Sequence, residues 1–385
     1  MTTQALVSRF ADALLLDGVR TPFADLNGAL SQVSPIDLGI KVARSVIARS
    51  GLPASDIGTV IAGNMAQACF DAFMMPRHVG LYAGAPVSTP AHLVQRVCGT
   101  GIEVISQAAD AVSLGRVELA LCVGAESMSR NPIAAYTHRA GFRMGQLEFK
   151  DFLWEALLDP SCGCTMGDTA ENLAREHGIS RAEVDAFASR SFERALAAQK
   201  SGFLAGEIVP VVNESFEAAG LATRAIRLVG KQVEIAADTH IRPSPVDALA
   251  KIRPAFGGVQ TGGNSSGIVD GAAAALVASS RYASAKGKKP LARLVAAAAA
   301  GVPPHIMGIG PVPAIQAVVE AAGLTLADIA RVEINEAFGA QALACARVLG
   351  LDEARLNVNG GAIAIGHPLG ATGVRLTVTV ARELA

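Results

Sequence analysis

Charged and aromatic residues are scarce in this chain of 385 residues: Asp, Glu, Lys and Arg make up 17% of it, and Phe, Trp and Tyr only 4%. Hydrophobic residues instead reach 51%. So little charge, beside so much apolar side chain to bury, excludes a disordered protein. The length predicts two or three domains of about 150 residues each.

An excess of one charge sign is also absent. The 33 Lys and Arg residues nearly balance 34 Asp and Glu residues, and neither sign forms a long run. This balance argues against nucleic acid or a membrane surface as a partner. The longest stretch without these residues, 294–319, is no membrane span because prolines interrupt it, at Pro303, Pro304, Pro311 and Pro313.

Cysteine is used sparingly, at six positions, and the apolar triplet 14–16 is too short for the core of a signal peptide. We therefore expect a cytoplasmic protein whose cysteines are buried or catalytic thiols. Cys122 and Cys345, in apolar surroundings, are predicted to be buried. The Cys162-Gly163-Cys164 motif could bind metal with a histidine, but one such pair is a weak signal, so a loop without metal is favoured.

The sequence contains an internal repeat. Residues 51–60 (GLPASDIGTV) and 323–332 (GLTLADIARV) share five residues, 272 positions apart. Each copy follows an amphipathic helix, near 36–49 and 314–321, that ends at a glycine suited to a left-handed C-cap before a β-branched strand. At the same offset, 99–101 (GTG) matches 371–373 (ATG), each opening an apolar helix, at 102–114 and 374–384. The repeat predicts two similar α/β halves.

Between the halves, residues 131–265 are richer in charge and include Trp154 and a polar helix at 180–199. We interpret them as an inserted lobe that covers a ligand. The repeat also predicts a gap: the continuous apolar strand at 119–123 has no counterpart, because its match would fall beyond Ala385. We expect the second half to lack its last strand or hairpin. Further residues of the natural chain, or another element, would have to take that place in the sheet.

Three segments place small residues around a reactive group: 97–101 with Cys98, 335–338 with Asn335, and 360–370 with His367. The repeat puts Cys98 and the loop of His367 at equivalent helix starts. If the halves pack about a pseudo-twofold axis, a thiol at a helix N-terminus would meet an imidazole that favours its thiolate, as in a nucleophile and its base. The glycine-rich segments do not fit ATP or NAD, because His367 stands where a phosphate loop needs lysine and the GTG segment lacks a third glycine.

These motifs closely resemble one family. DGVRTPF (17–23), VCGTG, GAESMSR (124–130), MGDTAENLA (166–174), TGGNSSGIVDGAA (261–273), INEAFGAQ and GGAIAIGHPLGATG occur in the order typical of thiolases, along nearly the whole chain. The resemblance implies a five-layered αβαβα fold. The two duplicated domains would be 1–130 with 266–284 and 285–385, the latter without its last strands, and a loop domain at 131–265 would cover CoA.

The implied activity is that of an acyltransferase: cleavage of a 3-ketoacyl-CoA by CoA, or condensation of two acetyl-CoA molecules. The resemblance implies no permanently bound cofactor, with acyl-CoA and CoA as substrates, a role in fatty acid metabolism, and a homodimer or homotetramer. By motif, Cys98 matches the nucleophile, His367 the base that activates it, and Asn335 the residue holding a water that binds the enolate oxygen. Ser266 matches a serine that contacts CoA, whereas Met166 and Phe338 match acyl-pocket residues; ordinary core packing is the alternative for these.

Two departures from the family pattern stand out. Thiolases carry a second cysteine in a Cys-x-Gly loop near their C-terminus, which these residues do not include. If the natural chain also ended at Ala385, we would expect Claisen condensation to be lost. Thr165 stands before Met166 where short-chain members often have histidine, so the acyl chain length stays open. Two alternatives are kept: a ketosynthase, which would need histidine in place of Asn335, and a non-catalytic thiolase-like CoA-binding subunit.

Overall fold

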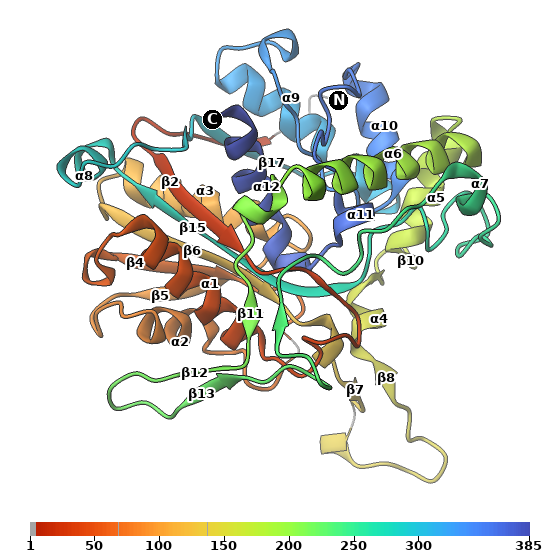
Figure 1. The fold of residues 1–385 in the computed structure, drawn as a ribbon. Helices are drawn as coiled ribbons and strands as arrows, with labels where there is room; N and C mark the ends of the chain where they lie inside the picture. The colour runs from red at the N-terminus through yellow and green to blue at the C-terminus, as the bar shows by residue number, and fades with distance from the viewer. Residues whose placement is uncertain (1–4, 68, 137) are drawn as a thin grey trace.

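The computed structural model describes residues 5–67, 69–136 and 138–385. A seven-stranded sheet lies at its centre, with helices on both faces (Figure 1). The main path of the sheet runs β16 (Ala292–Arg293), β2 (Leu14–Arg20), β15 (Val269–Ala278), β6 (Leu119–Glu126), β4 (Thr59–Gly63) and β5 (Ala91–Val94), and β3 (Ala24–Asp25) pairs with β15. β6, β4 and β5 are parallel, whereas β15 is antiparallel to both β2 and β6.

The central strands are buried along their whole length, as the continuous apolar run at 119–123 predicts for β6. Every residue of β6, β4 and β15 is buried. Alternate residues of these strands point into two apolar clusters, one on each face, since successive side chains of a strand point in opposite directions. The segment 266–284 therefore returns to the first half of the fold through β15 and continues into α8 (Ser280–Ala285).

The helices that the repeat predicts are present. α1 (Pro35–Ser50) and α9 (Pro311–Ala321) precede Gly51 and Gly323, which have φ values of 64° and 69°, the left-handed conformation expected there. α3 (Thr100–Ser113) and α12 (Leu369–Leu384) are the second matched pair. α1 and α2 (Met75–Tyr82) cover one face of the sheet, while α3 and α12 lie together on the other.

The second half forms a much smaller sheet. β17 (Ala296–Ala300) pairs antiparallel with β1 (Ala5–Arg9), and α9 packs on both strands. The β-branched strand expected near 331–334 was predicted wrongly: Val332 pairs with Leu356 in an isolated bridge only. A β-strand needs a hydrogen-bonded neighbour to form. Among the described residues, the sheet of β1 and β17 contains no further strand with which this segment could pair.

Residues 131–265 contain short hairpins and helices that lie beside the sheet. The longest of these helices, α6 (Arg181–Lys200), begins with a capping box in which Ser180 and Glu183 satisfy each other's backbone amides. α10 (Gly339–Leu349) and α11 (Ala362–Ile365) pack against it. The other lobe elements are α4 (Phe152–Ala156), α5 (Met166–Glu176), α7 (Val246–Leu249), β7 (Ile133–Ala134), β8 (Lys150–Asp151), β9 (Leu158–Asp159), β10 (Cys164–Thr165), β11 (Val211–Val212), β12 (Glu214–Phe216), β13 (Arg224–Ile226) and β14 (Glu234–Ile235).

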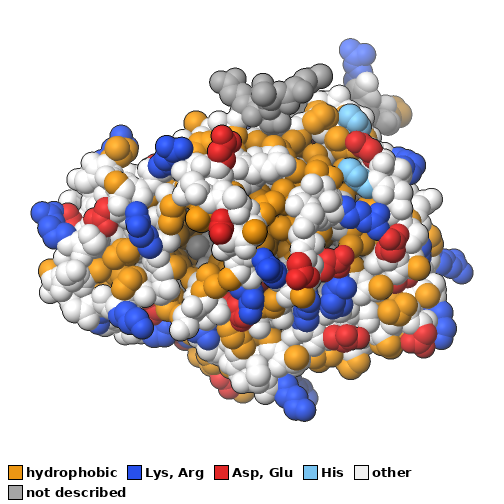
Figure 2. All heavy atoms as spheres, turned by 90° about the horizontal axis from the view of Figure 1, so that it is seen from above, with side chains coloured by type: hydrophobic (Ala, Val, Ile, Leu, Met, Phe, Trp, Pro, Cys, Tyr) orange, Lys and Arg blue, Asp and Glu red, His pale blue; other side chains and the backbone are white. Residues whose placement is uncertain are grey.

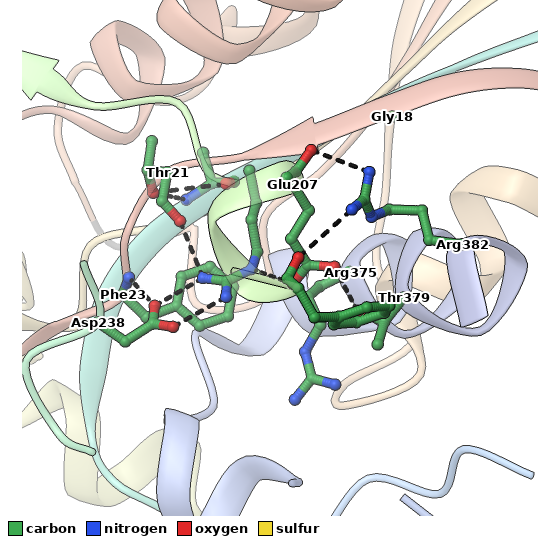
Figure 3. A network of polar contacts seen from close by, with 12 residues as sticks. Gly18, Thr21, Phe23, Glu207, Asp238, Arg375, Thr379 and Arg382 are labelled. Carbon is green, nitrogen blue, oxygen red and sulfur yellow. Dashed lines mark hydrogen bonds and ion pairs between the residues drawn. The ribbon is translucent and has the colours of Figure 1, made fainter. Parts of the chain in front are cut away.

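A buried ionic network fastens the lobe to both halves. Arg20, at the end of β2 and 1% exposed, contacts Glu207 and Asp238 of the lobe, each at 2.6 Å. Glu207 also accepts a hydrogen bond of 2.9 Å from Thr379 of α12 (Figure 3). Because α12 begins two residues after His367, this network fixes the helix that follows the loop of one candidate catalytic residue.

The surface agrees with the charge balance of the sequence. In the face shown in Figure 2, positive and negative side chains are interspersed, and hydrophobic side chains gather toward the middle. None of the helices in the described ranges is both long enough and apolar enough to cross a membrane.

Candidate active site

The starts of α3 and α12 meet backbone to backbone. A Cβ atom added to Gly101 would lie 2.5 Å from the amide nitrogen of Val374, and one added to Gly373 would lie 2.2 Å from that of Ile102. Only glycine permits so close an approach. The expectation that the two equivalent helix starts approach one another is therefore confirmed, and the loop of Cys98 and the loop of His367 lie at this junction.

Cys98 lies just before α3 in a tightly held loop. Val97 has a φ of 45°, unusual for a β-branched residue. Thr100 holds this conformation: its hydroxyl donates to the Val97 carbonyl at 2.6 Å and accepts from the Arg96 amide at 2.8 Å. The Cys98 side chain remains partly exposed and packs against a small apolar cluster that includes Leu369.

His367 is 4% exposed and is held at both ring nitrogens. Its Nδ1 lies 2.6 Å from the hydroxyl oxygen of Thr372, and its Nε2 lies 3.1 Å from Nδ2 of Asn335. The hydroxyl of Thr372 donates to the Pro368 carbonyl at 3.3 Å, so its oxygen accepts the Nδ1 proton. Nε2 therefore carries a lone pair, which the Asn335 amide contacts, and is the nitrogen that can take up a proton.

Asn335 has one further polar atom. Its Oδ1 is buried and has no hydrogen-bond partner among the residues that the structure describes. A buried amide oxygen without a partner costs free energy, and a bound water or substrate would remove that cost. Asn335 and His367 thus provide a donor, an acceptor and a base within one small region.

Both Cys98 and His367 are uncharged near neutral pH. Burial raises the pKa of the Cys98 thiol to about 11, opposed by a backbone hydrogen bond and reinforced by the charge of Glu126. Burial, and secondarily the charge of Arg375, lowers the pKa of His367 to about 3. The thiolate expected at a helix N-terminus is therefore not the resting form, because loss of solvent outweighs the effect of the helix.

One of the three predicted pocket residues, Phe338, contacts Phe256, which the sequence analysis missed. Phe338 precedes α10 and meets Phe256 edge to face, with ring centroids 6.1 Å apart. A Cβ added to Gly167, next to Met166, would lie 2.4 Å from the Phe256 ring. Ser266 donates its amide to Ala337, beside Phe338, at 3.0 Å. Met166, Ser266 and Phe338 are all partly exposed rather than sealed in the core.

The prediction that Cys122 and Cys345 are buried is confirmed. Cys162 and Cys164 lie in the β9–β10 hairpin of the lobe, and no group of three or more potential metal ligands occurs in the described residues.

The sequence analysis missed Thr372 as a candidate functional residue, although the repeat could have revealed it. It is the counterpart of Thr100, and each threonine holds the loop that carries one reactive residue: Thr100 the loop of Cys98, and Thr372 the loop of His367. The Phe256 contact carried no sequence signal, since it depends on how the lobe folds over α5.

Two domain families together match nearly the whole chain. The thiolase N-terminal domain matches residues 13–281, and the thiolase C-terminal domain matches residues 288–385.

Individual relatives agree with this match. Beta-ketothiolase BktB of Cupriavidus necator is 41% identical over 379 residues, which cover 97% of this chain and 92% of that protein. The mitochondrial 3-ketoacyl-CoA thiolase of Homo sapiens is 39% identical over 369 residues, covering 95% and 90%. The crystal structure of human mitochondrial 3-ketoacyl-CoA thiolase in complex with CoA is similar with a TM-score of 0.89 at 38% identity, covering 97% of this chain and 91% of that one.

Proposed function

Because this chain belongs to the thiolase family and is therefore an acyltransferase, we propose that it transfers acyl groups between CoA thioesters through an acyl-enzyme on Cys98. It has the layered α/β fold of that family. The reaction is cleavage of a 3-ketoacyl-CoA by CoA, or the reverse condensation of two acetyl-CoA molecules. The observation that carries this proposal is the meeting of the Cys98 and His367 loops at the Gly101–Gly373 contact.

In the first step the sulfur of Cys98 attacks the 3-keto carbon of the substrate. The thiol proton passes to Nε2 of His367, the nitrogen whose lone pair is free of a proton. Because the resting pair is uncharged, proton transfer and attack occur together rather than from a preformed thiolate.

The carbon–carbon bond then breaks and releases acetyl-CoA as its enolate. The enolate oxygen is bound by His367 and by a water that Asn335 holds, for which the unpartnered Oδ1 of Asn335 is an acceptor. A buried imidazolium beside Arg375 is unstable, so His367 readily gives up its proton to the leaving fragment. The thiol of a second CoA finally attacks the acyl group on Cys98 and regenerates the enzyme.

Substrate binding is assigned to the region around Phe256. Ser266 contacts CoA, whereas Met166 and Phe338 line the space for the acyl chain. The partial exposure of all three residues and the contact of Phe338 with Phe256 support this assignment. The same proposal divides the chain into 1–130 with 266–284, a CoA-covering lobe at 131–265, and 285–385.

We extend the proposal to the assembly and its setting. A homodimer or homotetramer is supported by large exposed apolar side chains in the lobe segment 133–154, which monomers rarely leave in water: Ile133, Tyr136, Phe142, Met144, Leu147, Phe149 and Trp154. Light scattering tests this assembly. A cytoplasmic role in fatty acid metabolism is supported by six cysteines that are all free thiols, as in a reducing compartment.

The acyl-enzyme is tested by intact-protein mass spectrometry with acetoacetyl-CoA, followed by peptide mapping. The expected result is one acetyl group on Cys98, none in the Cys98→Ser variant, and loss of the adduct when free CoA is added. A Cys98→Ala variant that folds normally but still turns over substrate at an appreciable rate would overturn the mechanism. Binding of CoA without any adduct in the wild type would favour a non-catalytic subunit.

A further inference from the structure

Glu126, the last residue of β6, is a buried carboxylate beside the candidate active site. It is 1% exposed, and none of the ion pairs within the described ranges includes it. Burial raises its pKa to about 7, against the effect of its hydrogen bonds. A buried carboxylate without a cation is costly, so its surroundings need to explain why it is there.

The carboxylate accepts four hydrogen bonds from two segments. The first segment follows β4: Asn64 donates from Nδ2 at 2.9 Å, Met65 from its amide at 2.8 Å, and Ala66 from its amide at 3.2 Å. The fourth donor, at 2.9 Å, is the amide of Gly370, in the first turn of α12 and three residues after His367. Glu126 therefore joins the first half of the fold directly to the loop of the candidate base.

The same region contacts the nucleophile. Met65 and Leu369 form, with Met128, the apolar cluster against which Cys98 packs. Both Met65 and Gly370, the neighbour of Leu369, donate their amides to Glu126. The start of α12 can approach β6 this closely because position 124 is a glycine: a Cβ on Gly124 would lie 2.2 Å from the Gly370 carbonyl oxygen.

From this geometry we propose that Glu126 is a positioning residue whose four hydrogen bonds fix the His367 loop against the Cys98 loop and hold a carboxylate close to the junction of the two loops. The inference deepens the proposed function, on which it rests for the role of Cys98. Glu126 does not itself contact substrate, because it is buried and its oxygens are occupied by the four donors. Its charge is the one anionic influence on the Cys98 thiol that the described residues supply.

Other ionisable groups near the junction do not offset this charge. His367 is neutral, since burial lowers its pKa to about 3. Of the other charged groups on the packed elements, Arg96 pairs with Glu103 at 2.8 Å, and Asp270, itself an anion, accepts a hydrogen bond of 2.6 Å from Ser129. Arg375 lies 3.3 Å from Glu333, although two of its nitrogens have no partner among the described residues. Neither arginine changes the pKa of Cys98.

The test is the pH profile of Cys98 alkylation by iodoacetamide in the ligand-free protein, with Cys98 quantified by peptide mapping. In the Glu126→Gln variant the profile is expected to move to lower pH, with alkylation at pH 8 about tenfold faster, because removal of a nearby negative charge stabilises the thiolate. General damage to the site would not selectively increase the thiolate fraction. A profile that stays in place or moves to higher pH overturns the inference.

Two variants separate charge from packing. Glu126→Asp keeps the charge but shortens the side chain, so thiolysis should slow while the alkylation profile stays close to wild type. Glu171→Gln is the matched control: Glu171 is also buried and accepts backbone hydrogen bonds, from Val259 and Gln260, but in the lobe, and its profile should not move. If Glu126→Asp moved the profile as far as Glu126→Gln, charge would not be the cause.

A wild-type measurement keeps the inference testable if Glu126→Gln fails to fold. As Glu126 ionises around pH 7, Cys98 becomes harder to ionise, so the logarithm of the alkylation rate should rise between pH 6 and 8 with a slope below one. A slope of one throughout would overturn the inference. Alkylation needs no CoA substrate, so failure of Cys98 acylation by acetoacetyl-CoA would reject the proposed function separately.

Discussion

The hydroxyl oxygen of Thr372 lies 2.6 Å from Nδ1 of His367 and determines which nitrogen of that ring carries a proton. Its repeat counterpart, Thr100, uses its hydroxyl to hold the loop of Cys98. Threonines at equivalent positions of the internal repeat thus orient the candidate nucleophile in one half and the candidate base in the other.

Replacing Thr372 by Val should slow thiolysis without abolishing it. The Nδ1 proton would lose its acceptor, and a buried donor without a partner costs about 1–3 kcal/mol, equivalent to about 5- to 160-fold in rate. Steady-state kinetics with acetoacetyl-CoA measure the effect, which should fall mainly on kcat. Thr372→Ser retains the hydroxyl and should stay near wild type; an equal loss in both variants would count against the role given to Thr372.

The neutral, buried state of His367 predicts sensitivity to acid. Its pKa is about 3 in the folded protein, against about 6.5 in an unfolded chain, so between these values the unfolded state binds a proton that the folded state does not. Folding stability should therefore fall as pH decreases from about 6.5 toward 3, by about 2–3 kcal/mol at pH 4.5 from this residue.

Urea unfolding at pH 7 and pH 4.5 measures this contribution. The wild type should lose more stability between the two pH values than His367→Asn does, because the other titrating groups are common to both proteins. Equal losses would show that His367 already carries its proton in the folded state.

The buried network of Arg20 predicts a large loss of stability on its disruption. Arg20→Leu would leave Glu207 and Asp238 buried without their partner, a change that typically costs about 3–5 kcal/mol. Arg281→Leu is the control: Arg281 pairs with Glu118, but its side chain is 80% exposed, so little change is expected. Denaturant midpoints compare the two, and similar small shifts would mean that the network does not fasten the lobe.

The contact between helix starts predicts that a single methyl group is too large at Gly101. Gly101→Ala would place a Cβ 2.5 Å from the Val374 amide, forcing the two helix starts apart and reducing both stability and thiolysis. Gly301→Ala is a suitable control, because no atom lies within 4 Å of the added carbon and its φ is not positive. Thermal unfolding and activity of both variants check the prediction.

The repeat made much of the fold predictable. Helix ends at Gly51 and Gly323, the paired helices α3 and α12, and the approach of their starts all follow from short-range patterns that recur at a fixed offset. The strand expected near 331–334 failed for a non-local reason: apolar β-branched residues favour a strand, but pairing needs a neighbour, and Val332 has one only at Leu356.

Candidate residues for the site could be named from the sequence, but their electrostatics could not. Motif order predicts Cys98, Asn335 and His367, and the structure brings Asn335 and His367 together. The raised pKa of Cys98, in contrast, depends on burial by segments far away in the sequence. Phe256 and Glu126 were likewise missed as site residues, because their roles arise from contacts that no local spacing encodes.

The division of the reactive residues between two halves also affects how the protein matures. Cys98 is synthesised early, whereas His367 and α12 emerge from the ribosome far later. If Cys98 and His367 act together as proposed, activity requires that the start of α12 has docked against the start of α3. The appearance of activity in a refolding experiment would then report the docking of the two halves.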